Sequence, residues 1–361
     1  MKRSIIDILD LTTAEVDELL ATAEDIMDHP ADYAEKCHGK KLATLFFEPS
    51  TRTRLSFEAA MYELGGNVLG FSDSNSSSAS KGESMADTAR VLSCYADIMA
   101  IRHPMAGAPF VAAQNASVPV INAGDGGHCH PTQTLADLLT IKRKKGTLKN
   151  LTVGFCGDLK YGRTVHSLIA ALSRYPGTRF VLISPEELAL PSYVKREILD
   201  GQNIPYRQAT NLEAVLPELD ILYMTRIQRE RFDDPSEYER LKDSYILAPD
   251  KLSKAREELI IMHPLPRVNE ISVAVDKDPR ACYFLQVLCG KYMRMALILK
   301  LLEDADKDVE PFGPSVVFDT MQCKNPACIT AKEQELSHAF YPVSAENGIY
   351  RCVYCEEKVT R

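Results

Sequence analysis

The feature that most constrains the fold of this chain is a repeated alternation of short apolar segments with amphipathic ones. Each apolar segment has the length and the continuous hydrophobicity of a strand that is buried on both faces. The expected strands are KKLATLFFE (40–48), ADIMAIRH (96–103), VPVINAGDG (118–126), NLTVGFCGD (150–158), RFVLISPEE (179–187), LDILYMTR (219–226) and LIIMHPLPR (259–267). Because strands that alternate with helices form parallel sheets, this pattern predicts an α/β protein.

Capping and stop residues mark the helices between these strands. Ser50 is the expected N-cap of a helix that ends at the glycine pair 65–66. Another helix begins at Pro131, ends at Gly146 and joins the first series of strands to the second. A long apolar helix over residues 283–302 closes the second series. We therefore expect two doubly wound parallel-sheet domains joined by interdomain helices.

Composition excludes several classes of function. The chain has 361 residues, enough for two or three domains, and a formal net charge of −8. An acidic chain without a basic tail is a poor general binder of nucleic acid. The N-terminus MKRSIIDILDLTT lacks the apolar run of a signal peptide, and Lys291, Arg294 and Lys300 interrupt the most apolar helix. The sequence predicts a cytoplasmic protein that binds neither membranes nor nucleic acid.

Cationic side chains follow several of the expected strands. They are Arg102 and His103, His130, Arg163, Arg226, and His263 with Arg267. In open parallel sheets ligands bind beyond the carboxyl ends of the strands, so these residues favour a pocket for an anionic small molecule. The chain lacks a P-loop, a GxGxxG turn after a strand and an acidic cluster for magnesium, which disfavours ATP and NAD as ligands.

The stretch FFEPSTRTRLSFE (46–58) places two arginines and three hydroxyl side chains at the start of a helix. The helix dipole is positive at this end and disfavours cations. We therefore expect an anion there, bound by backbone N–H groups, by the hydroxyls and by Arg52. Arg54 is expected in a supporting ion pair with Glu48.

Together these residues resemble the motifs of the aspartate carbamoyltransferase family over residues 1–308. The matching motifs are STRTR (50–54), KGES (81–84), RHP (102–104), HPTQTLADL (130–138), GDLKYGRTVHSL (157–168), YMTRIQRER (223–231) and HPLPRVNEI (263–271). The resemblance implies attack of the aspartate amine on carbamoyl phosphate, giving N-carbamoyl-L-aspartate and phosphate. This is an early step of pyrimidine biosynthesis and needs no catalytic cofactor.

The resemblance also implies roles for individual residues. Arg52, Thr53, Arg102 and His130 match the catalytic residues, and His130 would act as a neutral hydrogen-bond donor. The expected carbamoyl-phosphate ligands are Ser50, Thr51, Arg52, Thr53, Ser77, Lys81, Arg102, His130, Gln133, Leu265 and Pro266. The expected aspartate ligands are Lys81, Arg163, Arg226 and Gln228. Ser77 and Lys81 would enter the site of a neighbouring subunit, which implies a homotrimer with shared active sites.

The last four cysteines form a separate signal. Cys323 and Cys328 are spaced C-x4-C, and Cys352 and Cys355 are spaced C-x2-C. Two such pairs predict a structural zinc site with four thiolate ligands. The tail resembles the zinc domain of the regulatory chain of the same family, fused here to a catalytic chain. The family's nucleotide-binding effector domain is absent, so we expect no requirement for a separate regulatory chain and no response to ATP or CTP.

The expected organisation has three parts. Residues 1–135 form a carbamoyl-phosphate domain completed by the helix at about 283–305, residues 136–282 form an aspartate domain, and residues 310–361 form a small zinc-ribbon-like domain. Three competing interpretations remain. They are a transcarbamoylase with an ornithine-type acceptor, an inactive relative that serves as a scaffold, and a zinc ribbon that binds nucleic acid. The HPLP motif disfavours the first, because the ornithine enzyme carries an HCLP-type motif there.

Overall fold

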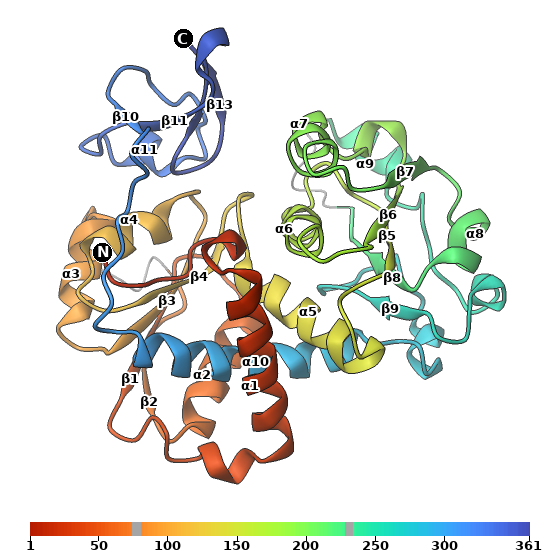
Figure 1. Cartoon of the computed structure of the whole chain (residues 1–361), viewed down its shortest axis with the longest axis horizontal. Coiled ribbons are helices and arrows are strands. Elements are labelled where there is room, and N and C mark those ends of the chain that lie inside the picture. The colour runs from red at the N-terminus through yellow and green to blue at the C-terminus, as the bar shows by residue number, and fades with distance from the viewer. Residues whose placement is uncertain (74–80, 228–233) are drawn as a thin grey trace. The chain divides into compact units, whose positions relative to one another are not determined.

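The structure is a computed structural model of the chain, and it describes residues 1–73, 81–227 and 234–361 (Figure 1). The chain divides into two compact units. Unit 1 comprises Met1–Leu11, Asp17–Thr132 and Lys291–Arg361, and unit 2 comprises Thr12–Val16 and Gln133–Gly290. Three of the boundaries fall inside helices, namely α1 (Thr13–Asp28), α5 (Pro131–Lys145) and α10 (Tyr283–Glu303), so these helices are shared between the units.

The first parallel sheet lies in unit 1, with its strands in the order β2-β1-β3-β4. Its strands are β1 (Lys41–Phe46), β2 (Asn67–Phe71), β3 (Ile98–His103) and β4 (Val120–Asp125). The helices of this part of the chain are α1 (Thr13–Asp28), α2 (Thr51–Glu63), α3 (Met85–Ser93) and α4 (Ala108–Asn115). The chain moves outward from β1 to β2 and then back past β1 to β3, so the strand order reverses between β1 and β3.

The second parallel sheet lies in unit 2, with its strands in the order β7-β6-β5-β8-β9. Its strands are β5 (Thr152–Cys156), β6 (Arg179–Ile183), β7 (Tyr206–Ala209), β8 (Ile221–Met224) and β9 (Ile260–Met262). The accompanying helices are α6 (Arg163–Leu172), α7 (Ser192–Val194), α8 (Leu212–Val215) and α9 (Pro235–Leu241). Here the strand order reverses between β5 and β8.

The C-terminal residues form an antiparallel sheet, shown in blue in Figure 1, with the order β10-β11-β12-β13. Its elements are β10 (Val317–Phe318), α11 (Ile329–Lys332), β11 (Ala339–Ser344), β12 (Ile349–Cys352) and β13 (Lys358–Thr360). We call residues 315–361 the cysteine module. Its buried residues, among them Phe340 and Tyr354, belong to the same hydrophobic cluster as strands β1 and β3, so the module packs on the first sheet's domain of its own chain.

The predicted fold class is confirmed, and each of the seven expected strands is present. Two edge strands, β2 and β7, were not predicted. Their residues are half-buried or exposed, whereas β5 is buried throughout, so they lack the continuous apolar run that identified the other strands. Over the described residues, none of the helices combines the length and apolarity needed to cross a membrane.

Candidate active site and metal centre

The predicted carbamoyl-phosphate residues of unit 1 gather where the strand order of the first sheet reverses. Strand β1 leads into the first turn of α2, and β3 ends at Arg102 and His103. Phe46 and Arg102 are paired across these two strands, and the Phe47 N–H donates to the Arg102 carbonyl at 2.9 Å. A strand-order reversal opens a crevice at the carboxyl ends of a parallel sheet, so the sheet itself brings the two segments together.

The first turn of α2 is arranged to receive an anion. Ser50 occupies the N-cap position, but its side chain makes no capping hydrogen bond to the helix. Thr51 and Arg52 are exposed, and Thr53 is half-buried. The first N–H groups of a helix have no partner within the helix, and together with the dipole they favour a bound anion.

The arginines around this turn have different partners. Arg102 forms an ion pair with Glu48, with Nη2 and Oε1 2.7 Å apart. Arg54 instead pairs with Glu58 one turn along α2, at 2.7 Å, so the expected Arg54–Glu48 pair is wrong. Burial, and then the positive charge of Arg102, lower the pKa of Arg52. No described carboxylate pairs with Arg52, which leaves its charge available to a ligand.

His130 is held by a short, closely bonded connection between β4 and α5. Asp125 ends β4 and is fully buried. One of its carboxylate oxygens accepts the Cys129 N–H at 2.9 Å, and the other lies 2.9 Å from Nδ1 of His128. His130 follows Cys129 directly and is buried, and Pro131 then starts α5. The sequence prediction missed Asp125 and His128; their position at the end of an expected strand was the available signal.

Two predicted residues cannot be placed here, and a third has no contact to these groups among the described residues. Ser77 and Gln228 lie outside the described residues. Lys81 is exposed and precedes α3, and no contact within the described chain joins it to the first turn of α2. Its predicted place is the site of a neighbouring subunit.

The predicted aspartate residues of unit 2 also follow strands at a reversal. Arg163 is the first residue of α6, which follows β5, and Arg226 follows β8. The two strands are neighbours, with Cys156 paired to Met224. The Asp158 N–H donates to the Thr225 hydroxyl at 2.9 Å, which ties the two loops together. The sheet therefore delivers both arginines to adjacent strand ends.

The HPLP turn after β9 is rigidly held. Leu265 has a φ of 52°, a conformation that costs free energy for a residue with a bulky side chain, and the Leu265–Pro266 peptide bond is cis. Nδ1 of the buried His263 accepts the Leu265 N–H at 2.8 Å, so Nε2 carries the proton that it donates to Glu270 at 2.7 Å. This network fixes the direction of the Leu265 carbonyl. The sequence analysis predicted the HPLP motif but not the hydrogen bonds made by His263 and Glu270.

Gln133 enters a further buried network of unit 2. Its Nε2 donates to Asp137 at 2.8 Å, and Asp137 also accepts the Tyr223 hydroxyl at 2.9 Å and Nε2 of Gln286 at 2.5 Å. Oε1 of Gln286 accepts the His263 N–H at 3.0 Å. The predicted ligand Gln133 is therefore joined through buried side chains to the start of the HPLP turn. Asp137 and Gln286 carried no sequence signal of their own.

The four predicted metal ligands meet in the cysteine module. Their sulfur atoms all lie within 4.8 Å of one another. The Cys323 and Cys355 sulfurs are 3.5 Å apart, and those of Cys328 and Cys352 are 3.9 Å apart. A tetrahedral zinc ion with sulfur ligands at about 2.3 Å separates those ligands by about 3.8 Å. The cluster thus fits one tetrahedral ion of a metal that prefers sulfur.

Family models match three successive parts of the chain. Residues 3–143 match the carbamoyl-phosphate-binding domain of aspartate/ornithine carbamoyltransferase, and residues 149–301 match its aspartate/ornithine-binding domain. A catalytic subunit of aspartate carbamoyltransferase from Lachnoclostridium phytofermentans is 64% identical over 300 residues, which cover 83% of this chain and 98% of that protein. The chain belongs to the aspartate carbamoyltransferase family.

Solved structures of the family agree with the observed fold. The catalytic subunit of M. jannaschii aspartate transcarbamoylase is 47% identical, with a TM-score of 0.79, over 84% of this chain and 98% of that one. The Trypanosoma cruzi enzyme in complex with carbamoyl phosphate and aspartate is 36% identical, with a TM-score of 0.78, over 83% and 97% of the two chains. Residues 315–361 match the metal-binding domain of the family's regulatory chain.

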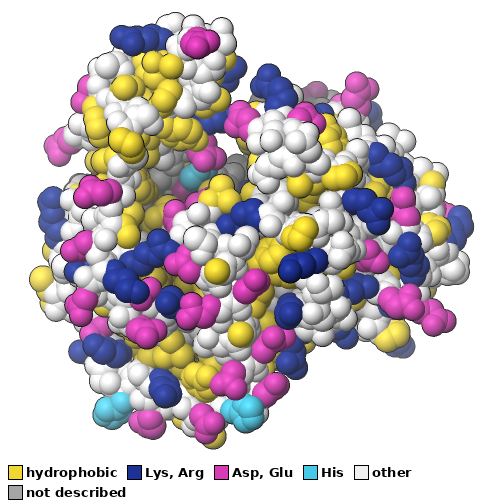
Figure 2. Space-filling view, in the orientation of Figure 1, with side chains coloured by type: hydrophobic (Ala, Val, Ile, Leu, Met, Phe, Trp, Pro, Cys, Tyr) yellow, Lys and Arg dark blue, Asp and Glu magenta, His cyan; other side chains and the backbone are white. Residues whose placement is uncertain are grey.

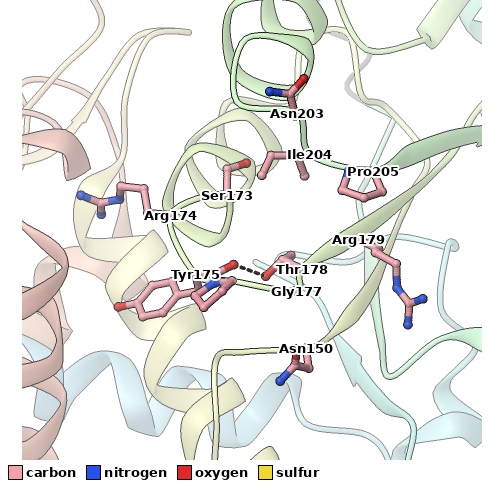
Figure 3. A pocket seen from close by; sticks show the side chains of 11 residues that line it. Asn150, Ser173, Arg174, Tyr175, Gly177, Thr178, Arg179, Asn203, Ile204 and Pro205 are labelled. Carbon is pink, nitrogen blue, oxygen red and sulfur yellow. Dashed lines mark hydrogen bonds between the residues drawn. The ribbon is translucent and has the colours of Figure 1, made fainter.

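A separate hollow lies at the opposite edge of the second sheet (Figure 3). It has a volume of about 650 Å³ and lies beside Asn150, Thr178 and Pro205, just before the strands begin. Arg174 and Arg179 also line it. In this family fold the ligand side is the carboxyl edge, so we assign the hollow no role in catalysis.

Proposed function

We propose that the chain catalyses carbamoyl transfer from carbamoyl phosphate to L-aspartate, yielding N-carbamoyl-L-aspartate and phosphate. The observation that carries this proposal is the placement of the family's motif arginines at the reversal point of each parallel sheet. The 64% identity to an aspartate carbamoyltransferase catalytic subunit supports aspartate as the acceptor. The product would be an early intermediate of pyrimidine biosynthesis.

The phosphate group of the substrate is bound at the first turn of α2. The backbone N–H groups and the hydroxyls of Ser50, Thr51 and Thr53 donate hydrogen bonds to it, and Arg52 supplies positive charge. Arg52 has no carboxylate partner among the described residues, so its charge is not already neutralised. Ser77 and Lys81 complete the site from a neighbouring subunit.

The reaction proceeds through a tetrahedral intermediate. The amine nitrogen of aspartate forms a bond to the carbonyl carbon, negative charge develops on the carbonyl oxygen, and the carbon–oxygen bond to phosphate then breaks. Thr53, Arg102 and His130 stabilise that oxygen, and donors of this kind contribute about 3 kcal/mol each in comparable sites. The leaving phosphate takes the proton of the amine. Gln133, with the Leu265 carbonyl and Pro266, positions the carbamoyl nitrogen.

The two carboxylates of aspartate are bound by arginines, which can pair with a carboxylate through two parallel hydrogen bonds. Arg163 and Arg226 take this role, and Gln228 and Lys81 assist. We propose a domain division at residues 135 and 282, with the helix at about 283–305 completing the first domain. It separates a carbamoyl-phosphate domain from an aspartate domain, with residues 310–361 as the metal domain.

The cysteine module holds a structural zinc ion through Cys323, Cys328, Cys352 and Cys355. Zinc cross-links segments that are too short to bury an adequate core, and no catalytic step uses it. Charged side chains of both signs are mixed over the face shown in Figure 2, which supports a structural role rather than nucleic-acid binding. The homotrimer, the cytoplasmic location and the indifference to ATP and CTP remain predictions.

One experiment tests the proposed function against its competitors. The purified chain is assayed for carbamoyl transfer with aspartate and with ornithine side by side, and zinc is measured in the same sample. We expect turnover with aspartate alone and one zinc ion per chain. Turnover with ornithine would favour the other acceptor class, and no turnover with either would favour an inactive scaffold.

A further inference from the structure

The cysteine module contacts its own unit beside three of the four segments that carry predicted carbamoyl-phosphate residues. The loop after β3 pairs with the module, since the Ala106 N–H donates to Ala327 and the Ile329 N–H donates to Ala106, at 2.8 and 2.9 Å. Glu333 accepts the first N–H of α3, from Met85, at 2.7 Å. The third contact joins Glu356 to His128 in the β4–α5 connection, directly before His130.

Glu356 reaches out of the module toward His128. Its Oε2 lies 3.8 Å from Nε2 of His128, which is the distance of an ion pair rather than of a direct hydrogen bond. The other ring nitrogen of His128 lies 2.9 Å from Oδ2 of Asp125. The ring of His128 therefore lies between one carboxylate from the catalytic part and one from the module.

The backbone at Glu356 is unusual. Its φ is 59°, a left-handed conformation in which glycine or asparagine is preferred. The turn itself requires this geometry, because the Glu356 N–H donates to the Cys352 carbonyl at 2.9 Å within the metal-binding knuckle. A glutamate in such a position costs free energy relative to glycine, which points to a role for its side chain. Here the side chain faces His128.

His128 is tightly connected to His130. The Asp125 N–H donates to the Cys129 carbonyl at 3.2 Å, and the Cys129 N–H donates to Asp125, so residues 125–129 form a closed loop. The orientation of this loop determines where the next residue, His130, directs its side chain. Asp125 also accepts the Gly107 N–H at 2.9 Å and so links the loop to the segment after Arg102.

We propose that Glu356 is a positioning residue for carbamoyl transfer, which holds the 125–129 loop through His128 and thereby directs His130 at the carbamoyl group. The inference rests on the proposed function. It assigns the cysteine module a part in substrate binding on its own chain, in addition to its structural role. Glu356 contacts neither substrate nor the reacting atoms.

The test uses the full-length, zinc-loaded protein and calorimetry without aspartate. The variants are Glu356→Gln, His128→Asn, the double variant, and Glu357→Gln as a control that removes the same charge one residue further on, at an exposed side chain. Two probes are compared. By the proposed assignments, His130 contacts the carbamoyl group of carbamoyl phosphate, whereas inorganic phosphate binds at the first turn of α2 without a contact to His130.

We expect carbamoyl-phosphate affinity to fall about 2- to 30-fold in Glu356→Gln and in His128→Asn, the range typical of residues that couple sites indirectly. The double variant should lose no more than either single variant, because the two residues act on one loop. Affinity for inorganic phosphate and the KM for aspartate should not change in these variants. The Glu357→Gln variant should bind carbamoyl phosphate as tightly as the wild type does. A merely structural defect would lower the affinity for both probes.

Amide hydrogen exchange provides a readout that is independent of activity. Residues 125–130 should exchange faster in Glu356→Gln and His128→Asn but not in Glu357→Gln. Wild-type exchange and wild-type carbamoyl-phosphate affinity in both single variants would overturn the inference, as would losses that multiply in the double variant. Absence of carbamoyl transfer by the wild-type chain would instead count against the proposed function, and the exchange data would still decide the role of Glu356. Because His128 lies outside the module, its variant stays informative even if Glu356→Gln lowers the zinc content.

Discussion

At the scale of single residues, Arg52 and Arg54 show how two similar side chains in one motif acquire different tasks. Arg54 lies four residues before Glu58 on α2, and the two form an ion pair at 2.7 Å. Arg52 points from the first turn and has no carboxylate partner among the described residues. One arginine supports the helix, and the other keeps its charge for the phosphate.

Replacing Arg52 with alanine should therefore lower kcat by about 100- to 1000-fold, as for other groups that stabilise developing charge. The thermal unfolding temperature should change little, because the Arg52 side chain is exposed. Arg54→Ala is the matched control and should lose far less activity. Steady-state assays of both variants decide this, and near-normal turnover by Arg52→Ala would refute the assignment of the motif.

Arg226 is expected to act on the other substrate. Arg226→Ala should raise the KM for aspartate by about 10-fold or more, because a charge-assisted pair with a carboxylate contributes roughly 1.5–3 kcal/mol. The KM for carbamoyl phosphate should stay close to that of the wild type. Lys160→Ala, at an exposed position in the loop after β5, is the control. Saturation curves for aspartate that coincide in all three proteins would remove Arg226 from the site.

Glu270 makes the HPLP turn sensitive to acid. Burial raises the pKa of its carboxyl, but the hydrogen bond from His263 and those from the backbone outweigh burial and lower the pKa below the ordinary 4.5. A depressed pKa contributes stability that is present above the unfolded-state value and is lost as the pH falls through the folded-state value. The free energy of unfolding of the wild-type chain should therefore decline below about pH 4.5.

Glu270→Gln removes this titration. The variant should be less stable than the wild type at pH 7, and the difference should shrink as the pH falls below 4.5. Urea unfolding at a series of pH values measures it. A difference that stays constant down to the lowest pH would show that the Glu270 charge does not stabilise the turn.

At the scale of elements, sequence patterns identified the strands and helices that a single run of residues encodes. Seven buried strands and the helix that became α10 were predicted because each is encoded in a continuous run of residues. Strands β2 and β7 were missed, because edge strands need less burial and their sequences do not differ from loops. The Glu48–Arg102 pair joins segments that only the sheet register brings together, and no sequence spacing indicates it.

The residues of the candidate site also divide into those that the sequence identified and those that it did not. Residues at the expected strand ends were found from the sequence, because the carboxyl edge of a parallel sheet is a general ligand position. The buried groups behind them, Asp137 and Gln286, could not be found, since their roles depend on partners from distant parts of the chain. The Arg54–Glu58 pair was available from its spacing of four residues on a helix, yet the proximity of Glu48 in the sequence favoured the wrong partner.

The contact between α4 and the cysteine module allows a test at this scale. Gly107 has a φ of 85°, and a Cβ added there would lie 2.5 Å from Cβ of Tyr354. Gly107→Ala should destabilise the chain by about 1–3 kcal/mol through overpacking and loosen the module. Gly39→Ala is the matched control, because Gly39 has a similar φ of 78° and nothing within 4 Å. Equal unfolding free energies for the two variants would mean that the module does not pack on α4.

At the scale of the whole molecule, the chain combines two sources of stability, which are the burial of apolar cores and the binding of a metal ion. The parallel-sheet domains have large buried cores, whereas the cysteine module shares the cluster of the first sheet and contributes a few buried residues such as Phe340 and Tyr354. A segment of this size gains on the order of 10 kcal/mol from a structural zinc ion. The module should therefore depend on its metal while the two parallel-sheet domains do not.

Removal of zinc by a chelator should accordingly unfold residues 315–361 selectively. Hydrogen exchange should become fast in the module and at the Met85 and Ala106 contacts, while the core strands β1 and β5 stay protected. Carbamoyl-phosphate affinity should fall at least as far as in Glu356→Gln, because the Glu356–His128 contact is lost together with those at Met85 and Ala106. Cys355→Ser should reproduce the change, and Cys94→Ser, at an exposed thiol outside the module, should not. A module that keeps its protection after the zinc is gone would show that packing on the first sheet's domain is sufficient to fold it.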